Sequence, residues 1–348
     1  MGDRLRSTAR TAAALLAAAL ALPACGSSAS SSSATKTVAP ATTSGPTTTA
    51  APPPAIAELS AARRPSLGQF PRSTGRTLQQ LGTLVRATAQ LGAATGTFTP
   101  GVRRLAFGLN TSSGAFVYAP TAVYIATSPG APARGPFLAP ADPLIVAPGY
   151  RSKQNAGPGD IEAIYAALIP IPHPGTYAVL SMTRTPSGLV GAPGEIAVRA
   201  FSPIPDAGQR PPAIHTDTLA TVHGNATLLT TRAPPEHMQS TSFDQVLGKR
   251  PIALMFSTPE LCTSRICGPV TDVAVQLQHR FGAQIVFIHE EVFVNNRPAQ
   301  GLRPQLEAFH LQTEPWLFVI NRQGIITTRL EGAFGLNEAQ QALETALR

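Results

Sequence analysis

The sequence predicts two domains of different fold class, an all-β sandwich followed by an α/β domain. The 348 residues are enough for two domains of ordinary size. From about residue 97 to residue 204, short apolar or alternating runs are separated by Gly- and Pro-containing turns, which is typical of antiparallel strands. After the Pro-rich stretch 202–212, buried-strand runs alternate with helical periods, which is typical of a mixed α/β sheet. We place the two domains at residues 58–207 and 208–348.

The first 24 residues have the features of an export signal. Three arginines precede the apolar run "TAAALLAAALALPA", which is too short for a comfortable membrane-spanning helix. The stretch "LPAC" at 22–25 resembles the lipobox of bacterial lipoproteins. The resemblance implies a signal peptide over residues 1–24, a lipid on Cys25, and a mature chain anchored at the extracytoplasmic face of the cell membrane.

A segment with almost no large apolar residues follows the signal. Residues 25–57 are almost only Ser, Thr, Ala, Pro and Gly, so they cannot offset the entropy of ordering and are expected to form a flexible tether. The formal net charge is +8, and loss of residues 1–24, which hold three Arg and one Asp, would leave +6. The basic residues are scattered and lack aromatic interleaving. This pattern predicts no nucleic-acid partner and fits attraction to anionic lipid or wall polymer.

The first domain is predicted to start with a helix over residues 76–91, where Leu78, Leu81 and Leu84 have helical spacing. About six or seven strands are then expected, among them the runs "RLAFGL", "AFVYA", "AVYIAT", "IEAIYAAL", "TYAVLSM" and "EIAVRAF". The stretch "PIPHPGTYAVLSM" resembles the penultimate strand region of immunoglobulin-like modules, in which a Pro-Gly turn precedes an aromatic-bearing strand. The resemblance implies an immunoglobulin-like sandwich. It contains no cysteine, so its stability would depend on packing.

The second domain has the predicted order strand, helix, strand, helix, strand, strand, helix. The strands are "PIALMFS", "AQIVFIH", "WLFVI" and "IITTRL", and the helices are "VTDVAVQLQHRF", "PQLEAF" and "NEAQQALETAL", the last capped by Asn337. The stretch "ELCTSRICGPV", between the first strand and the first helix, holds Cys262 and Cys267. This order, with a cysteine pair at this place, resembles the thioredoxin family over most of residues 240–348.

The resemblance to thioredoxins implies roles for individual residues. "ALMFSTPELC" puts Cys262 in the position of the nucleophile and Cys267 in that of the resolving cysteine. "TEPWLFVINRQGII" puts Pro315 where the family keeps a cis-proline facing the disulfide, and Glu314 and Trp316 would flank that substrate-facing edge.

The spacing of the cysteines departs from the family, because four residues separate them where thioredoxins have two. Positions five apart on a helix point about 140° away from each other, and their Cα atoms lie beyond the roughly 7 Å limit of a disulfide. We therefore expect Cys262 on the loop that enters the helix, or a first turn that opens when the bond forms. Unpaired N–H groups at the helix start would lower a thiol pKa, and Arg265 would add to this effect. The sequence leaves open which sulfur is favoured.

Two further departures predict slow or specialised exchange. Leu261 replaces the family's Trp before the first cysteine, and Met255 replaces its buried acid on the preceding strand. Proton transfer from the resolving thiol is then expected to be slow, unless Glu260 or Glu290 takes the place of that acid.

Three other functions stay open at this point. "STPELCTSRICGP" resembles the one-subunit peroxiredoxins in its four-residue spacing, although Pro259 lies where their hydroxyl residue is expected and Pro315 where they tend to place Arg. Copper delivery, similar to that of the Sco proteins, would need a histidine beside two thiolates, and His289 is the candidate. The third is a non-catalytic scaffold with a static disulfide.

The function predicted is a membrane-anchored extracytoplasmic thiol–disulfide oxidoreductase. It would use Cys262 and Cys267 without a cofactor or a resident metal. Its partners would be exported proteins that contain cysteine, or a membrane redox protein, and the sequence leaves the direction of electron flow open.

Overall fold

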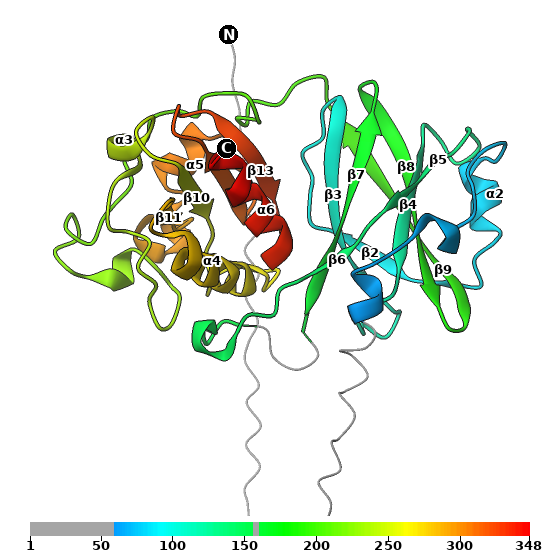
Figure 1. Ribbon diagram of the computed structural model, residues 1–348, viewed down its shortest axis with the longest axis horizontal. Helices are drawn as coiled ribbons and strands as arrows, with labels where there is room; N and C mark the ends of the chain where they lie inside the picture. The colour runs from blue at the N-terminus through cyan, green and yellow to red at the C-terminus, as the bar shows by residue number, and fades with distance from the viewer. Residues whose placement is uncertain (1–58, 156–159) are drawn as a thin grey trace, which may run out of the picture. The chain divides into compact units, whose positions relative to one another are not determined.

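The computed structural model describes residues 59–155 and 160–348. The predicted signal peptide, Cys25 and the tether lie outside this part of the chain. Among the described residues, none of the helices combines the length and the apolar character needed to cross a membrane. The β-strands of the first domain and the α/β sheet of the second are drawn in Figure 1.

Two sheets make up the first domain, with strand orders β1-β9-β8-β4-β5 and β2-β3-β7-β6. The strands are β1 (Ala87–Thr88), β2 (Gln90–Ala93), β3 (Gly101–Asn110), β4 (Thr121–Ala126), β5 (Arg134–Leu138), β6 (Ala141–Pro143), β7 (Ala163–Ile171), β8 (Gly175–Thr185) and β9 (Gly188–Val198). Neighbouring strands are antiparallel except β1 and β9. Phe107 and Tyr165 of one sheet share a buried cluster with Val123, Val179 and Ile196 of the other. The expected all-β sandwich is therefore present.

Two expectations for this domain are wrong. The helix predicted over 76–91 is only α2 (Leu78–Gly82), because the chain then enters β1 and β2. There the backbone N–H of Arg86 donates to the Leu189 carbonyl at 2.8 Å, so pairing with the sheet outweighs the helical spacing. The run "AFVYA" is not a strand: it makes an isolated bridge from Phe116 to Asn110, and the backbone N–H of Val117 donates to the Leu109 carbonyl at 2.9 Å.

The second domain has the predicted order of strands and helices around a four-stranded sheet, β11-β10-β12-β13. Its elements are β10 (Ile252–Phe256), α4 (Cys267–Phe281), β11 (Val286–Glu290), α5 (Pro304–Ala308), β12 (Trp316–Ile320), β13 (Ile326–Glu331) and α6 (Leu336–Ala346). Strand β10 is parallel to β11 and antiparallel to β12, and β12 is antiparallel to β13. The short helices elsewhere are η1 (Leu67–Gln69), η2 (Pro148–Tyr150), η3 (Ala226–Leu228), α3 (Phe243–Val246), η4 (Val294–Asn296) and η5 (Pro298–Gln300).

The two faces of this sheet have separate cores. Successive side chains of a strand point to opposite faces. Accordingly, Met255 of β10 packs with Val273 of α4 and with α6, whereas Phe256 packs with Phe309, which follows α5. The first of these clusters also contains Ala106 and Ile164 of the sandwich. One apolar core is therefore shared by the two domains.

The cap of α6 comes from the sandwich and not from Asn337, which corrects the sequence prediction. The N-cap residue is Gly335, which offers no side chain. Instead, Asp142 of β6 accepts hydrogen bonds from the backbone N–H groups of Asn337 at 3.1 Å and Glu338 at 2.8 Å. A carboxylate there satisfies N–H groups that have no partner within the helix.

Candidate functional site

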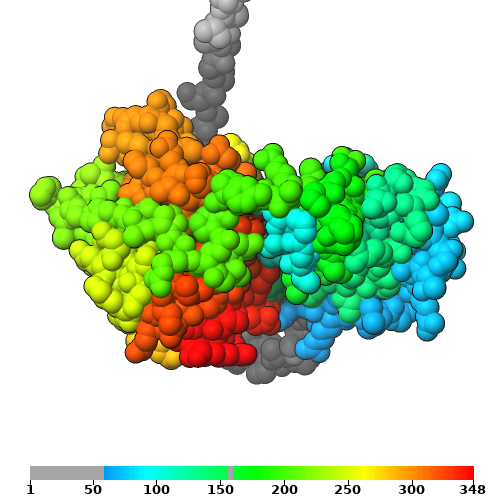
Figure 2. All heavy atoms as spheres, turned by 90° about the horizontal axis from the view of Figure 1, so that it is seen from above, coloured from blue at the N-terminus to red at the C-terminus, as the bar shows by residue number. Residues whose placement is uncertain are grey.

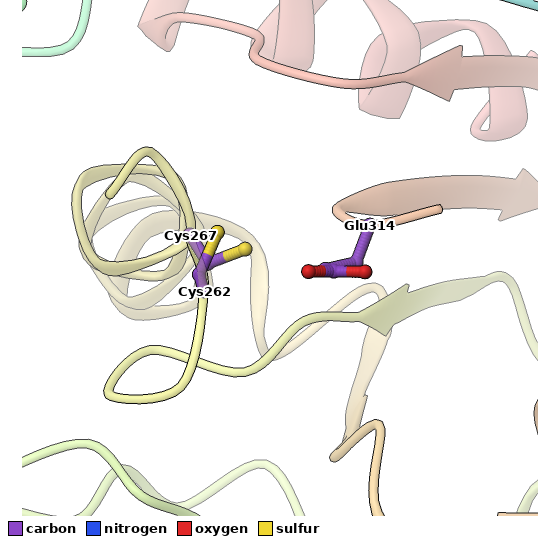
Figure 3. A group of neighbouring side chains, drawn as sticks. All are labelled: Cys262, Cys267 and Glu314. Atoms are coloured by element: carbon purple, nitrogen blue, oxygen red, sulfur yellow. The ribbon is translucent and has the colours of Figure 1, made fainter. Parts of the chain in front are cut away.

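Two thiols and a carboxylate meet at the start of α4. Helix α4 begins at Cys267, whereas Cys262 lies on the loop between β10 and α4, which is one of the two arrangements expected from the spacing. The Sγ atoms of both cysteines and a carboxylate oxygen of Glu314 all lie within 4.8 Å of one another (Figure 3). Both cysteines are free thiols, and their exposed fractions are 7 % and 0 %.

The loop brings Cys262 back over the helix start by a tight turn. The N–H of Arg265 donates to the Cys262 carbonyl at 3.1 Å, and Arg265 has a φ of +60°. A left-handed backbone at a non-glycine residue is uncommon and occurs mostly in turns. Pro269 is the third residue of α4, where its missing N–H leaves no helical hydrogen bond unmade.

The surroundings of the two thiols shift their pKa values in opposite directions. A hydrogen bond from the Cys267 thiol lowers the pKa of Cys262 to about 6, against the effect of burial. Ser264 adds to the lowering, with its Oγ 3.1 Å from the Cys262 Sγ, and so do the backbone N–H groups of Cys267 and Ser264. Burial and donation to Cys262 raise the pKa of Cys267 well above its usual range. At neutral pH the site therefore holds one thiolate, Cys262, beside one protonated thiol.

The carboxylate beside the two thiols is that of Glu314. It precedes Pro315 in a cis peptide bond at the start of β12, and Figure 3 shows its carboxylate directed at the sulfurs. Burial, and then the negative charge of Cys262, raise the pKa of this half-buried carboxylate. The two acids proposed from the sequence do not join the cluster: Glu260 is exposed, and Glu290 pairs with Arg303 at 2.9 Å. The only sequence signal for Glu314 was its place beside the expected cis-proline.

One of the residues expected beside the substrate lies elsewhere. Trp316 is fully buried, and its ring stacks on Phe318 with 5.8 Å between centroids, because β12 directs it into the core. Its indole N–H donates to the Thr313 carbonyl at 2.8 Å. Arg265 is exposed and pairs with Asp160 at 3.2 Å, and hydrogen bonds rather than its charge lower the pKa of Cys262.

His289 is part of a separate buried network. Its Nδ1 lies 2.5 Å from Glu236 Oε1, and its Nε2 lies 2.8 Å from Ser257 Oγ. Burial opposes a charge on this ring, but the Glu236 carboxylate raises the pKa of His289 to about 9. Both ring nitrogens are occupied, so the two-thiolate and histidine set needed for the copper hypothesis is not formed. No sequence signal linked Glu236 to His289, because 53 residues separate them.

The sandwich contributes a loop to the helix that carries Cys267. Ser152 N–H and Asn155 Nδ2 donate to Asp272 of α4 at 2.9 and 2.8 Å, and Arg232 Nε lies 2.9 Å from the same carboxylate. The carbonyl of Gln154 lies so close over Gly268 that a Cβ there would be 2.1 Å from it. The first turn of α4 is therefore held from outside its own domain.

Comparisons with known proteins do not show a family for this chain. No protein-family model and no curated protein matches the chain. Among solved structures, a putative thiol:disulfide interchange protein DsbE from Chlorobium tepidum is similar to part of it, at 14 % identity and a TM-score of 0.30. That likeness covers 41 % of this chain and 99 % of the other.

Proposed function

We propose that this protein is a thiol–disulfide oxidoreductase whose α/β domain is thioredoxin-like and whose sandwich is immunoglobulin-like. The observation that carries the proposal is the pair of Sγ atoms within 4.8 Å, one with a lowered and one with a raised pKa. A ready nucleophile beside a protonated partner is what exchange through a mixed disulfide requires.

Thiol–disulfide exchange needs no protein groups other than the two cysteines and Glu314. The Cys262 thiolate attacks one sulfur of a substrate disulfide, forms a mixed disulfide, and releases the other substrate sulfur as a thiolate. Cys267 then loses its proton, which Glu314 is placed to accept through a water molecule. The Cys267 thiolate attacks the Cys262 sulfur and expels the second substrate thiolate. The substrate gains two electrons, and the pair becomes a disulfide; the reverse sequence oxidises a client dithiol.

Hydrogen bonding at Cys262 favours exchange over peroxide reduction. The pKa of Cys262 is lowered by the Cys267 thiol, Ser264 and backbone N–H groups. Among the described residues, no guanidinium hydrogen-bonds to this sulfur. Pro315 occupies the place at which the peroxidase hypothesis required an arginine.

We further propose that a lipid on Cys25 anchors the mature chain outside the cytoplasm. The support for this is the order of charge, apolar run and "LPAC" in the sequence. In that location disulfides form and persist, so a reactive pair has substrates and partners. The proposed partners are exported proteins that contain cysteine, or a membrane redox protein.

Trapping of the mixed disulfide tests the proposed function. In Cys267→Ser, Cys262 can still attack a small aromatic disulfide but cannot resolve the product, so a one-to-one adduct should accumulate. Cys262→Ser leaves only the thiol with the raised pKa, and its adduct should form at least about 100-fold more slowly at neutral pH. Equal rates in the two variants, or no adduct in either folded variant, would reject the proposal.

A further inference from the structure

Glu314 is a half-buried carboxylate without a counter-ion. In the described part of the chain it makes no hydrogen bond and no ion pair. Polar groups withdrawn from water normally have a partner, so an unpaired carboxylate needs an explanation. What it faces is the two cysteine sulfurs, each of which can become an anion (Figure 3).

Three anionic donors at this distance form an incomplete coordination shell. A tetrahedral zinc ion has bonds of about 2.3 Å to sulfur and about 2.0 to 2.2 Å to oxygen, which holds its ligand atoms roughly 3.5 to 4 Å apart. The ligand atoms of Cys262, Cys267 and Glu314 lie within 4.8 Å of one another, so closing around an ion needs a movement of about 1 Å. The exposed turn after Cys262 can supply that movement.

The donor set selects among metals. Two thiolates favour soft or borderline ions and disfavour Mg²⁺ and Ca²⁺, while a carboxylate oxygen is a poor third ligand for Cu(I). Zn²⁺ accepts sulfur and oxygen together in four-coordinate sites, and three protein ligands plus one water is a common arrangement.

We propose that the reduced protein binds one Zn²⁺ ion through Cys262, Cys267 and Glu314, with a water as the fourth ligand. The ion takes the place of the missing counter-charge and displaces the proton of Cys267. This site goes beyond the proposed exchange function: the same cysteines serve as ligands when reduced, and their exchange chemistry does not need the metal.

Oxidation of the pair releases the ion. A disulfide oxidant such as oxidised glutathione accepts two electrons from the two thiolates and leaves as two glutathione thiolates. The protein keeps the Cys262–Cys267 disulfide, and Zn²⁺ departs without a change of its own charge. Binding is thus limited to the reduced chain.

Metal titration of the folded, reduced, chelator-treated protein tests the site. We expect one Zn²⁺ per chain by competition with a chromophoric chelator, and Co²⁺ should give thiolate-to-metal charge-transfer absorption with the intense visible bands of a tetrahedral site. Addition of oxidised glutathione should release the metal. Glu314→Gln should weaken Zn²⁺ binding by at least about tenfold, since even an outer-shell partner is worth about 10- to 100-fold.

Two further variants separate the possible outcomes. Glu260→Gln removes an exposed carboxylate from the loop that carries Cys262, and this variant should bind Zn²⁺ as the wild type does. Glu314→His keeps a ligand at the position and should retain more affinity than Glu314→Gln. Affinity unchanged in Glu314→Gln, or retained in the Cys262→Ser, Cys267→Ser double variant, would overturn the site. Exchange by the metal-free protein is measured separately, so failure of the metal site and failure of the proposed function are distinguishable.

Discussion

Cys262 and Cys267 differ in acid–base character because of their neighbours. The Cys262 sulfur accepts from a thiol, a hydroxyl and two backbone N–H groups, whereas Cys267 is fully buried and donates to it. Hydrogen bonds to a thiolate favour the charged form, and burial disfavours it. The two identical side chains thus become a nucleophile and a proton-bearing partner.

The first prediction concerns the pH at which Cys262 ionises. The ultraviolet thiolate absorbance of reduced protein should rise with a midpoint near pH 6, instead of near the usual 9, and this rise should be absent in Cys262→Ser. Because the folded pKa is depressed, the group stabilises the reduced chain fully above about pH 9, and that stabilisation is lost as pH falls through about 6.

Ser264→Ala should move the midpoint of Cys262 ionisation to higher pH, since it removes the hydroxyl that donates a hydrogen bond to the Cys262 sulfur. Thr263→Ala, at the neighbouring exposed position, is the control and should leave the midpoint in place. A wild-type midpoint near 9 would contradict the hydrogen-bonded thiolate.

At the residue scale, the sequence could predict positions but not orientations. The thioredoxin-like pattern located Cys262, Cys267 and Pro315, because local order along the chain determines them. It did not predict that Glu314 faces the thiols or that Trp316 is buried. The orientations of Glu314 and Trp316 depend on which face of β12 is covered, and the elements that cover it are distant in the sequence.

At the scale of elements, α4 depends on a glycine in its first turn. Gly268 has helical backbone geometry, so a side chain would cost nothing within the helix itself. It is the carbonyl of Gln154, from the loop of the sandwich, that occupies the space of a Cβ. The glycine therefore allows close approach of the two backbones.

The second prediction compares two helical glycines. Gly82→Ala, in α2, meets nothing within 4 Å and should raise the free energy of unfolding by up to about 1 kcal/mol, the helix propensity gain. Gly268→Ala should instead lower it by roughly 1 to 3 kcal/mol, because Gln154 must move. Denaturant unfolding of the two variants measures both changes. A neutral or stabilising Gly268→Ala would show that the Gln154 loop does not press on α4.

The helices and strands could be predicted where the apolar residues of a segment follow a single spacing, that of a helix or that of a strand. The strands and helices of the α/β domain follow their apolar patterns, as β10 and α4 illustrate. Residues 76–91 have a helical period yet pair with the edge of a sheet, and α6 takes its cap from Asp142, 195 residues away from Asn337. Partners that distant leave no trace in a local pattern.

Over the whole molecule, the sandwich contacts two helices of the α/β domain, α4 and α6. Asp272 of α4 is held by Ser152 and Asn155, and Arg104 of β3 bonds to Glu338 Oε2 of α6 at 2.7 Å. Figure 2 shows the red C-terminal part of the chain bordering the cyan segment that contains β3. Because these contacts hold α4 and α6 in place, the pair should cycle within an intact fold.

A redox titration of the native protein in thiol–disulfide buffers, with alkylation and mass readout, tests whether Cys262 and Cys267 exchange disulfides while the chain stays folded. We expect one reversible two-electron transition of the two cysteines, near −270 mV for a reductant or nearer −120 mV for an oxidant, with circular dichroism unchanged. No such transition is expected in Cys267→Ser. A pair that stays reduced, or that changes state only when the chain unfolds, would show that the protein is not a thiol–disulfide oxidoreductase.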